Sequence, residues 1–152
     1  MNIWYIHPYG GGPGVGRLFR PWHLAREWAK LGATCQVFVA RFHHLLDRSE
    51  MLPAAMDVAG VRYETLKTGR YEGNGLGRVL QMLAFCGSMW GLRKRVGKDL
   101  QKPDVIIVSS PHPFIIYPAL LLARRFKAKL VFEVRDLWPL SIVKMAGTSK
   151  FH

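Results

Sequence analysis

Five glycines within seven residues form the first stretch of this sequence whose composition suggests binding chemistry. They lie between Gly10 and Gly16, directly after the short apolar run of residues 2–7. Without side chains, backbone N–H groups can approach an anion closely, and the positive end of a following helix favours the same charge. A structural tight turn is the alternative explanation. We predict a phosphate-binding loop whose residues are Gly11, Gly12, Gly14, Gly16 and Arg17.

This glycine loop lacks the details of two common nucleotide-binding motifs. Gly11 and Gly16 have the outer spacing of a Walker A loop, but Arg17-Leu18 stands where lysine and Ser/Thr are required. No register of the loop gives GxGxxG, and the next apolar run ends in Arg41 instead of an acid that would hold a ribose. An ATPase and an NAD enzyme are disfavoured. An NADP-dependent oxidoreductase domain, with Arg41 on the 2′-phosphate, stays open as an alternative.

Polar side chains also follow two later apolar runs. His112 stands between two prolines after residues 105–108, where a loop histidine can hydrogen-bond a substrate hydroxyl or phosphate. Arg135 and Asp136 follow the run 129–134, where charges are costly unless they are paired. We predict all three as catalytic or substrate-orienting residues. The alternatives are a histidine satisfied by the backbone and an internal Arg135–Asp136 ion pair.

Other reactive residue types lack the neighbours that their chemistry needs. His7 and the pair His43-His44 follow apolar runs, but no carboxylate or cysteine stands at ligand spacing from them, so we predict no metal site. Cys35 and Cys86 form no CxxC pair, and the sequence contains no GxSxG motif. A disulfide scaffold, a zinc site and a hydrolase with a side-chain nucleophile therefore have no support.

Apolar runs and helical patterns alternate along the chain and would position these residues. The order of strand, glycine loop, helix and strand is that of a βαβ unit with parallel strands. We predict an α/β fold, a Rossmann-like doubly wound parallel sheet in a single domain, whose carboxyl strand ends bring the polar segments together. The predicted strands are 2–7, 37–40, 61–66, 105–108 and 129–134, the predicted helices are 18–31, 76–100 and 114–125, and 41–60 is predicted to be less regular.

The charge balance predicts an anionic partner, because 22 Lys and Arg face 10 Asp and Glu, for a net charge of +12. Nucleic acid, an anionic membrane face and a phosphorylated small molecule all satisfy that demand, and a solvated basic surface is the alternative. Met89 and Trp90 precede the basic run 93–95. They would either enter the interface of an anionic bilayer, or lie in the core while the cations stabilise the helix end.

The sequence favours a cytoplasmic chain. Its start lacks a basic segment followed by a long apolar stretch, so it does not have the pattern of a signal peptide. The most apolar window, 79–92, is shorter than the ~20 residues of a membrane-spanning helix. We expect a location in the reducing cytoplasm, with peripheral contact at the inner face of the cell membrane.

Three stretches together resemble the N-terminal domain of GT-B glycosyltransferases of family four. They are the glycine loop, the run LAREWAKLG at 24–32 and the run EVRDLWP at 133–139. The likeness is greatest to the WbuB-like subgroup, N-acetylfucosamine transferases of surface-polysaccharide assembly. Ala33 is a small departure, since the family usually has histidine there.

The resemblance implies retaining transfer of a sugar from a nucleoside-diphosphate sugar, a co-substrate in place of a cofactor, to a saccharide acceptor on a lipid diphosphate. Residues 1–152 would be the acceptor-side domain, without the C-terminal donor-binding domain and so incomplete as an enzyme. The amides of Gly12 and Gly14 would face the donor diphosphate, His112 would contact the donor sugar or the acceptor, and Arg135 and Asp136 would orient the substrate. A membrane- or nucleic-acid-binding module without catalysis is the rival interpretation, although no nucleic-acid motif is present.

Overall fold

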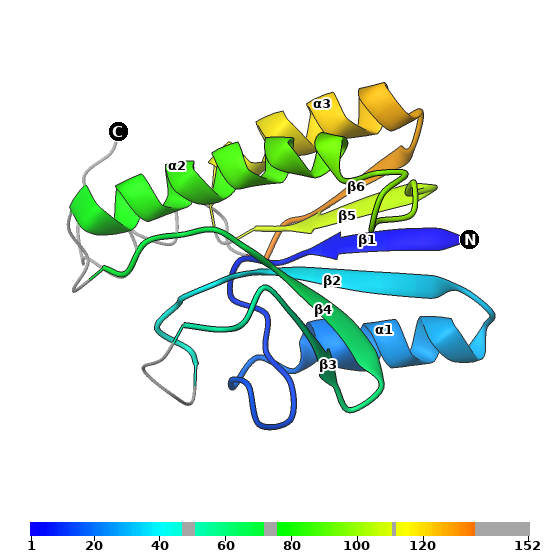
Figure 1. The fold of residues 1–152 in the computed structure, drawn as a ribbon, viewed down its shortest axis with the longest axis horizontal. Coiled ribbons are helices and arrows are strands. Elements are labelled where there is room, and N and C mark those ends of the chain that lie inside the picture. The colour runs from blue at the N-terminus through cyan, green and yellow to red at the C-terminus, as the bar shows by residue number, and fades with distance from the viewer. Residues whose placement is uncertain (47–50, 72–75, 111, 136–152) are drawn as a thin grey trace, which may run out of the picture.

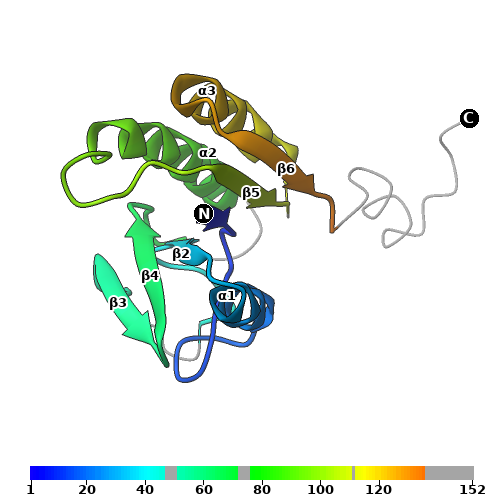
Figure 2. The same cartoon turned by 90° about the vertical axis from the view of Figure 1, so that its right-hand side faces the viewer.

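Runs of β-branched and aromatic residues form the strands of one six-stranded sheet, with the order β3-β4-β2-β1-β5-β6. The computed structural model describes residues 1–46, 51–71, 76–110 and 112–135. Helix α1 covers one face of the sheet, and α2 and α3 lie side by side on the other (Figure 1, Figure 2). The elements are β1 (Asn2–Ile6), α1 (Arg20–Lys30), β2 (Thr34–Ala40), β3 (Ala55–Val58), β4 (Val61–Leu66), α2 (Leu76–Gly91), the 3-10 turn η1 (Leu92–Lys94), β5 (Val105–Ser109), the 3-10 turn η2 (Pro113–Ile115), α3 (Ile116–Phe126) and β6 (Lys129–Glu133).

The five predicted strands are present and run parallel, which confirms the Rossmann-like α/β fold. Strand β3 was not predicted, and it pairs with β4 in the antiparallel direction, so the sheet is mixed and not wholly parallel. A tight turn through Ala59 and Gly60, both with positive φ, joins the two strands. The β3 sequence AMDV is short and half exposed, and so carries too little apolar pattern to distinguish it from the irregular stretch around it.

Each face of the sheet has its own apolar core. Between the sheet and α2 and α3, Trp4 is fully buried and packs its ring against those of Phe38 and Phe126, with centroids 5.1 and 5.7 Å away. On the α1 side, Ala25 of the helix packs with the valines of β2 and with Tyr63. Both cores lie under helices whose N-terminal ends point to the carboxyl edge of the sheet (Figure 1).

Helix α2 is shorter than predicted and buries three of its side chains. It ends at Gly91, so the basic residues after it belong to η1 and to the loop that follows, where Gly97 has a φ of 83°. The side chains that α2 buries are Gln81, Phe85 and Met89. Met89 is therefore a core residue, which confirms the core alternative for this residue, whereas Trp90 is partly buried against the same core and stacks with Arg93.

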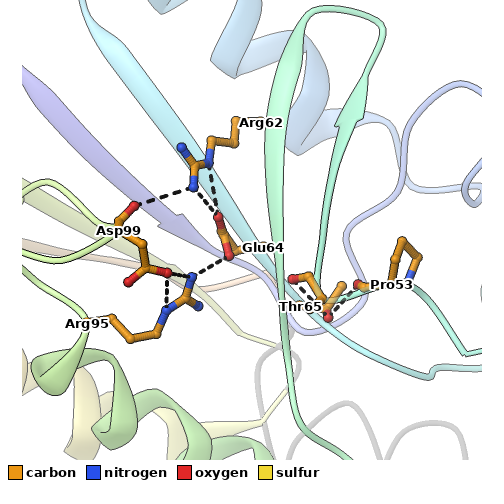
Figure 3. Close-up of polar contacts among 7 residues, drawn as sticks. Pro53, Arg62, Glu64, Thr65, Arg95 and Asp99 are labelled. Carbon is orange, nitrogen blue, oxygen red and sulfur yellow. Dashed lines mark hydrogen bonds and ion pairs between the residues drawn. The ribbon is translucent and has the colours of Figure 1, made fainter.

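A buried carboxylate ties the loop after η1 to the sheet (Figure 3). Glu64 of β4 is 1% exposed and accepts from Arg62 at 2.7 Å and from Arg95 at 2.9 Å. Arg95 also donates through Nε to Asp99 at 2.8 Å. The two guanidinium groups satisfy the carboxylate, and Arg95 fixes the loop against β4.

Candidate active site

The candidate site is a cavity of about 270 Å³ at the carboxyl edge of the sheet. In a doubly wound fold, strand ends and helix N-termini converge at this edge, which is where such folds bind their ligands. Two larger hollows, of about 570 and 640 Å³, lie at the opposite edge, beside the start of β2, and a third, of about 380 Å³, lies between β4 and α2. The residues that line the smaller cavity are His7, Tyr9, Leu18, His44, Leu45, Arg78, Ser110 and Arg135.

The glycine loop folds back on itself beside this cavity. A Cβ atom at Gly11 would lie 2.5 Å from the Gly16 carbonyl oxygen, and one at Gly16 would lie 2.7 Å from that of Leu45. At Gly12 it would meet Val58 of β3 at 2.8 Å. Backbone and side-chain packing therefore requires glycine at these three positions, in line with the structural alternative for the loop.

Most loop amides already have acceptors within the protein. The amides of Gly11 and Gly16 donate to the carbonyls of Leu18 and Gly12, and that of Arg17 donates to Leu45. Gly14 is exposed at the tip with a φ of 74°. Helix α1 begins at Arg20 and not directly after the last glycine, so its N-terminus stands apart from the loop. The role of the loop in binding phosphate stays a prediction.

His7 and Arg135 meet in the cavity although 128 residues separate them. Nη1 of Arg135 lies 2.8 Å from Nε2 of His7, and the amide of Tyr9 donates to Nδ1 of His7 at 3.2 Å. The Arg135 amide donates to the hydroxyl of Ser110 at 3.0 Å, which holds the end of β6 against the loop after β5. Burial, with the charge of Arg135, lowers the pKa of His7 to about 3, so the imidazole is neutral at pH 7.

This pairing leaves a hydrogen-bond donor without an acceptor. A neutral imidazole has one lone pair and one N–H. The Arg135 guanidinium and the Tyr9 amide only donate, and they approach Nε2 and Nδ1 of the same ring. Because the ring has one lone pair, it accepts from one of them and leaves the other without an acceptor, which an anion or a substrate oxygen in the cavity would supply.

The cavity wall is cationic. Arg78, in the first turn of α2, lines the cavity together with Arg135, and no acidic side chain stands among the described lining residues. Burial lowers the pKa of His44, with Arg78 adding to the effect, and Nδ1 of His44 lies 2.9 Å from the Tyr71 hydroxyl. An anion would be attracted to this wall.

Glu133 at the end of β6 does not line the cavity and is bonded to Tyr5 and Arg20. It accepts from the Tyr5 hydroxyl at 2.8 Å and from Nε of Arg20 at 2.6 Å. Burial acts to raise the pKa of Glu133, but these hydrogen bonds bring it below its ordinary value. The ion pair links the start of α1 to the last strand, and Arg20 is therefore engaged structurally.

Two more histidines are buried at the same edge of the sheet. His112 is 2% exposed, its Nδ1 has no hydrogen-bond partner among the described residues, and its ring lies 5.8 Å from that of Phe114. Burial, with a smaller effect of Arg78, lowers the pKa of His112 to about 4. Burial likewise lowers the pKa of His43 to about 4. Both imidazoles are neutral at pH 7.

The structure brings some of the predicted residues together and leaves others apart. Arg135 lines the cavity, whereas His112 and the exposed Arg17 are not among its lining residues. Asp136 lies outside the described residues, so its pairing with Arg135 stays a prediction. Sequence reasoning missed Arg78, because nothing in a helical pattern distinguishes a cation that faces a cavity from one that faces solvent. From the sequence, His7 was considered only as a possible metal ligand.

Comparison with known protein families assigns this chain to a family. A family model described as "Glycosyl transferase 4-like domain" matches residues 14–149, which is most of the chain and includes the last two glycines of the loop, α2 and the end of β6. A search of curated proteins finds no match. With its Rossmann-like sheet, its cationic cavity at the carboxyl edge and this extensive match, the chain belongs to the family of glycosyl transferase 4-like domains.

Proposed function

We propose that the chain is the acceptor-side domain of a retaining, WbuB-like glycosyltransferase of surface-polysaccharide biosynthesis. It would use a nucleoside-diphosphate sugar as donor and a saccharide carried on a lipid diphosphate as acceptor. Membership of the glycosyltransferase family supports transfer of a sugar. The cationic cavity supports a substrate that carries phosphate.

One observation carries the proposal furthest, namely that Nη1 of Arg135 and the Tyr9 amide both approach the neutral ring of His7, which can accept from only one of them. A phosphate oxygen in the cavity would accept from the donor that the ring leaves unpaired, and Arg78, which lines the same cavity, would add its charge. Such an oxygen would complete the hydrogen bonding of the site.

The remaining predicted residues have supporting roles in the proposal. His112, neutral at pH 7, would hydrogen-bond a hydroxyl of the donor sugar or acceptor, and Asp136 would orient the substrate beside Arg135. The Gly14 amide, exposed at the loop tip, would face the donor diphosphate. Catalysis by such a site is positioning, together with stabilisation of the departing diphosphate, and needs no side-chain nucleophile.

The NADP alternative loses the residue on which it depended. Arg41 donates through Nε to the Leu52 carbonyl at 3.0 Å and lines a different cavity, of about 380 Å³, between β4 and α2. It is therefore not beside the glycine loop's cavity, where the 2′-phosphate would have to lie. A cationic cavity would attract the phosphates of either co-substrate, so the family match is what favours a nucleoside-diphosphate sugar.

The proposal predicts that Arg135→Ala weakens the binding of inorganic pyrophosphate by at least about tenfold, because charge-assisted hydrogen bonds contribute roughly 1.5–3 kcal/mol. Isothermal titration calorimetry measures the change. Arg26→Ala is the matched control, since Arg26 is an exposed cation that stacks on Trp22 at 4.5 Å on the α1 side. Equal losses in the two variants, or tight and specific binding of NADPH or duplex DNA, would contradict the proposal.

A further inference from the structure

The outer surface of α2, η2 and α3 exposes an unusual number of large apolar side chains. Leu76 is 81% exposed, Tyr117 is 69% exposed and Leu80 is 65% exposed. Single exposed leucines are ordinary on a protein surface, but a group on adjacent helices marks a contact surface. We call this group the outer apolar patch; its members are Leu76, Val79, Leu80, Leu83, Phe114, Tyr117, Leu120 and Leu121.

The outer apolar patch adjoins the candidate site. The first turns of α2 project past the carboxyl ends of β1 and β5, and α3 lies alongside α2 (Figure 1). Arg78 lines the cavity, while Val79 and Leu80, the next two residues, are exposed to solvent. A surface that covered the patch would therefore lie directly beside the cavity.

The charge around the patch has one sign. Residues 76–98 and 105–132, which include the helical layer that carries the patch, contain no Asp or Glu, and Asp99, which follows the first range, is paired with Arg95. The layer on the other face differs, because α1 carries Glu27, paired there with Lys30. Apart from Arg95, which is paired with Glu64 and Asp99, the cations of the first layer are Arg78, Arg93, Lys94, Lys98, Arg124, Arg125, Lys127 and Lys129.

We propose that the outer apolar patch docks this chain on an anionic lipid bilayer. The exposed leucines and Tyr117 would enter the boundary between headgroups and acyl chains, and the surrounding cations would meet the lipid phosphates. Among the described residues, no helix is long and apolar enough to cross a membrane, so the contact is peripheral. This inference deepens the proposed function, since a lipid-linked acceptor lies in a membrane and the patch places the cavity at its surface.

The charges of this layer favour an anionic bilayer over a second copy of the chain as the partner. Two copies that met through this layer would bring two predominantly cationic surfaces together, and like charges oppose such contact. An anionic bilayer attracts the same cations. Apolar area and charge thus favour the same partner.

Vesicle co-sedimentation of the full chain tests the patch. We expect binding to vesicles of phosphatidylcholine and phosphatidylglycerol, weaker binding to phosphatidylcholine alone, and at least about tenfold weaker partitioning for Leu80→Ser/Leu83→Ser. Leu31→Ser is the matched control, because Leu31 is 83% exposed at the end of α1 on the opposite face. All three substituted side chains are exposed, and circular dichroism checks that each variant stays folded.

Three results would overturn the inference: absence of binding to anionic vesicles, an equal loss in Leu31→Ser, or a patch substitution that dissolves a dimer in sedimentation velocity without changing vesicle binding. Pyrophosphate affinity, measured on the same variants, should stay unchanged. Failure of vesicle binding with intact pyrophosphate binding would thus remove the docking surface alone, whereas loss of pyrophosphate binding by the unsubstituted chain would remove the proposed function.

Discussion

Acidification from about pH 7.5 to about pH 5 should destabilise the fold by an amount comparable with the whole stability of a small domain. His7, His43 and His112 are buried and neutral, with pKa values lowered to about 3, about 4 and about 4. In the unfolded chain each would bind a proton near its ordinary pKa of about 6.5. Between these values the unfolded state holds more protons, so stability rises with pH and is lost as the pH falls through this window.

Each of these histidines should contribute about 2 kcal/mol to that loss at pH 5. Glu133 adds little there, because its pKa lies below the ordinary value and its contribution is lost only at lower pH. Urea unfolding followed by tryptophan fluorescence at a series of pH values measures the slope. His43→Gln should remove about one proton from the difference in bound protons between the two states, which lowers the slope by about 1.4 kcal/mol per pH unit. His23→Gln, which replaces an exposed side chain of α1, is the control substitution. A pH-independent free energy of unfolding across this window would refute the buried, neutral state of the three rings.

Removal of both arginines around Glu64 should cost about 3–5 kcal/mol of folding free energy, because it leaves a buried carboxylate without a counter-charge. The double variant Arg62→Ala/Arg95→Ala does this (Figure 3). Arg95 also holds the loop after η1, so its loss frees that loop as well. Urea unfolding at neutral pH measures the free energy.

A second substitution separates charge from packing in this network. Adding Glu64→Gln to the double variant should recover most of the lost stability, because a neutral amide is far less costly to bury than an unpaired carboxylate. Lys30→Ala is the matched control, since it breaks an exposed pair with Glu27, which solvent screens, and should leave the stability almost unchanged. If Glu64→Gln recovered nothing, the arginines would be acting through their aliphatic packing and not through their charge.

Strand and helix order followed from the sequence because it depends on local apolar pattern. The βαβ start and the β-branched runs each contain enough residues to show their period. Strand β3 was not predicted, since its four half-exposed residues show no clear alternation of apolar and polar side chains. Its formation depends on pairing with β4. Helix α2 was predicted over 76–100, but the apolar pattern does not say which side of a helix is buried when both sides are apolar. Phe85 and Met89 are buried, whereas Leu76, Leu80 and Leu83 are exposed.

The site was harder to predict than the fold because it depends on contacts between distant residues. Arg135 was predicted from its place after a strand, but its meeting with His7 requires β1 and β6 to lie on the two sides of β5. The glycine loop was predicted to bind phosphate, whereas three of its glycines are needed for close packing against Leu45, Val58 and the loop itself. Composition alone could not separate these two uses of glycine.

The central claim is that a diphosphate is bound where His7 and Arg135 meet. Its most direct test is amide chemical-shift mapping by NMR during titration with a water-soluble, short-chain prenyl-diphosphate sugar. We predict that the largest shifts occur at His7, Tyr9, Ser110 and Arg135, around the cavity at the carboxyl edge, and that Arg135→Ala abolishes them. Largest shifts at the opposite edge, around Lys98 and Lys102, or an unchanged response in Arg135→Ala, would contradict it.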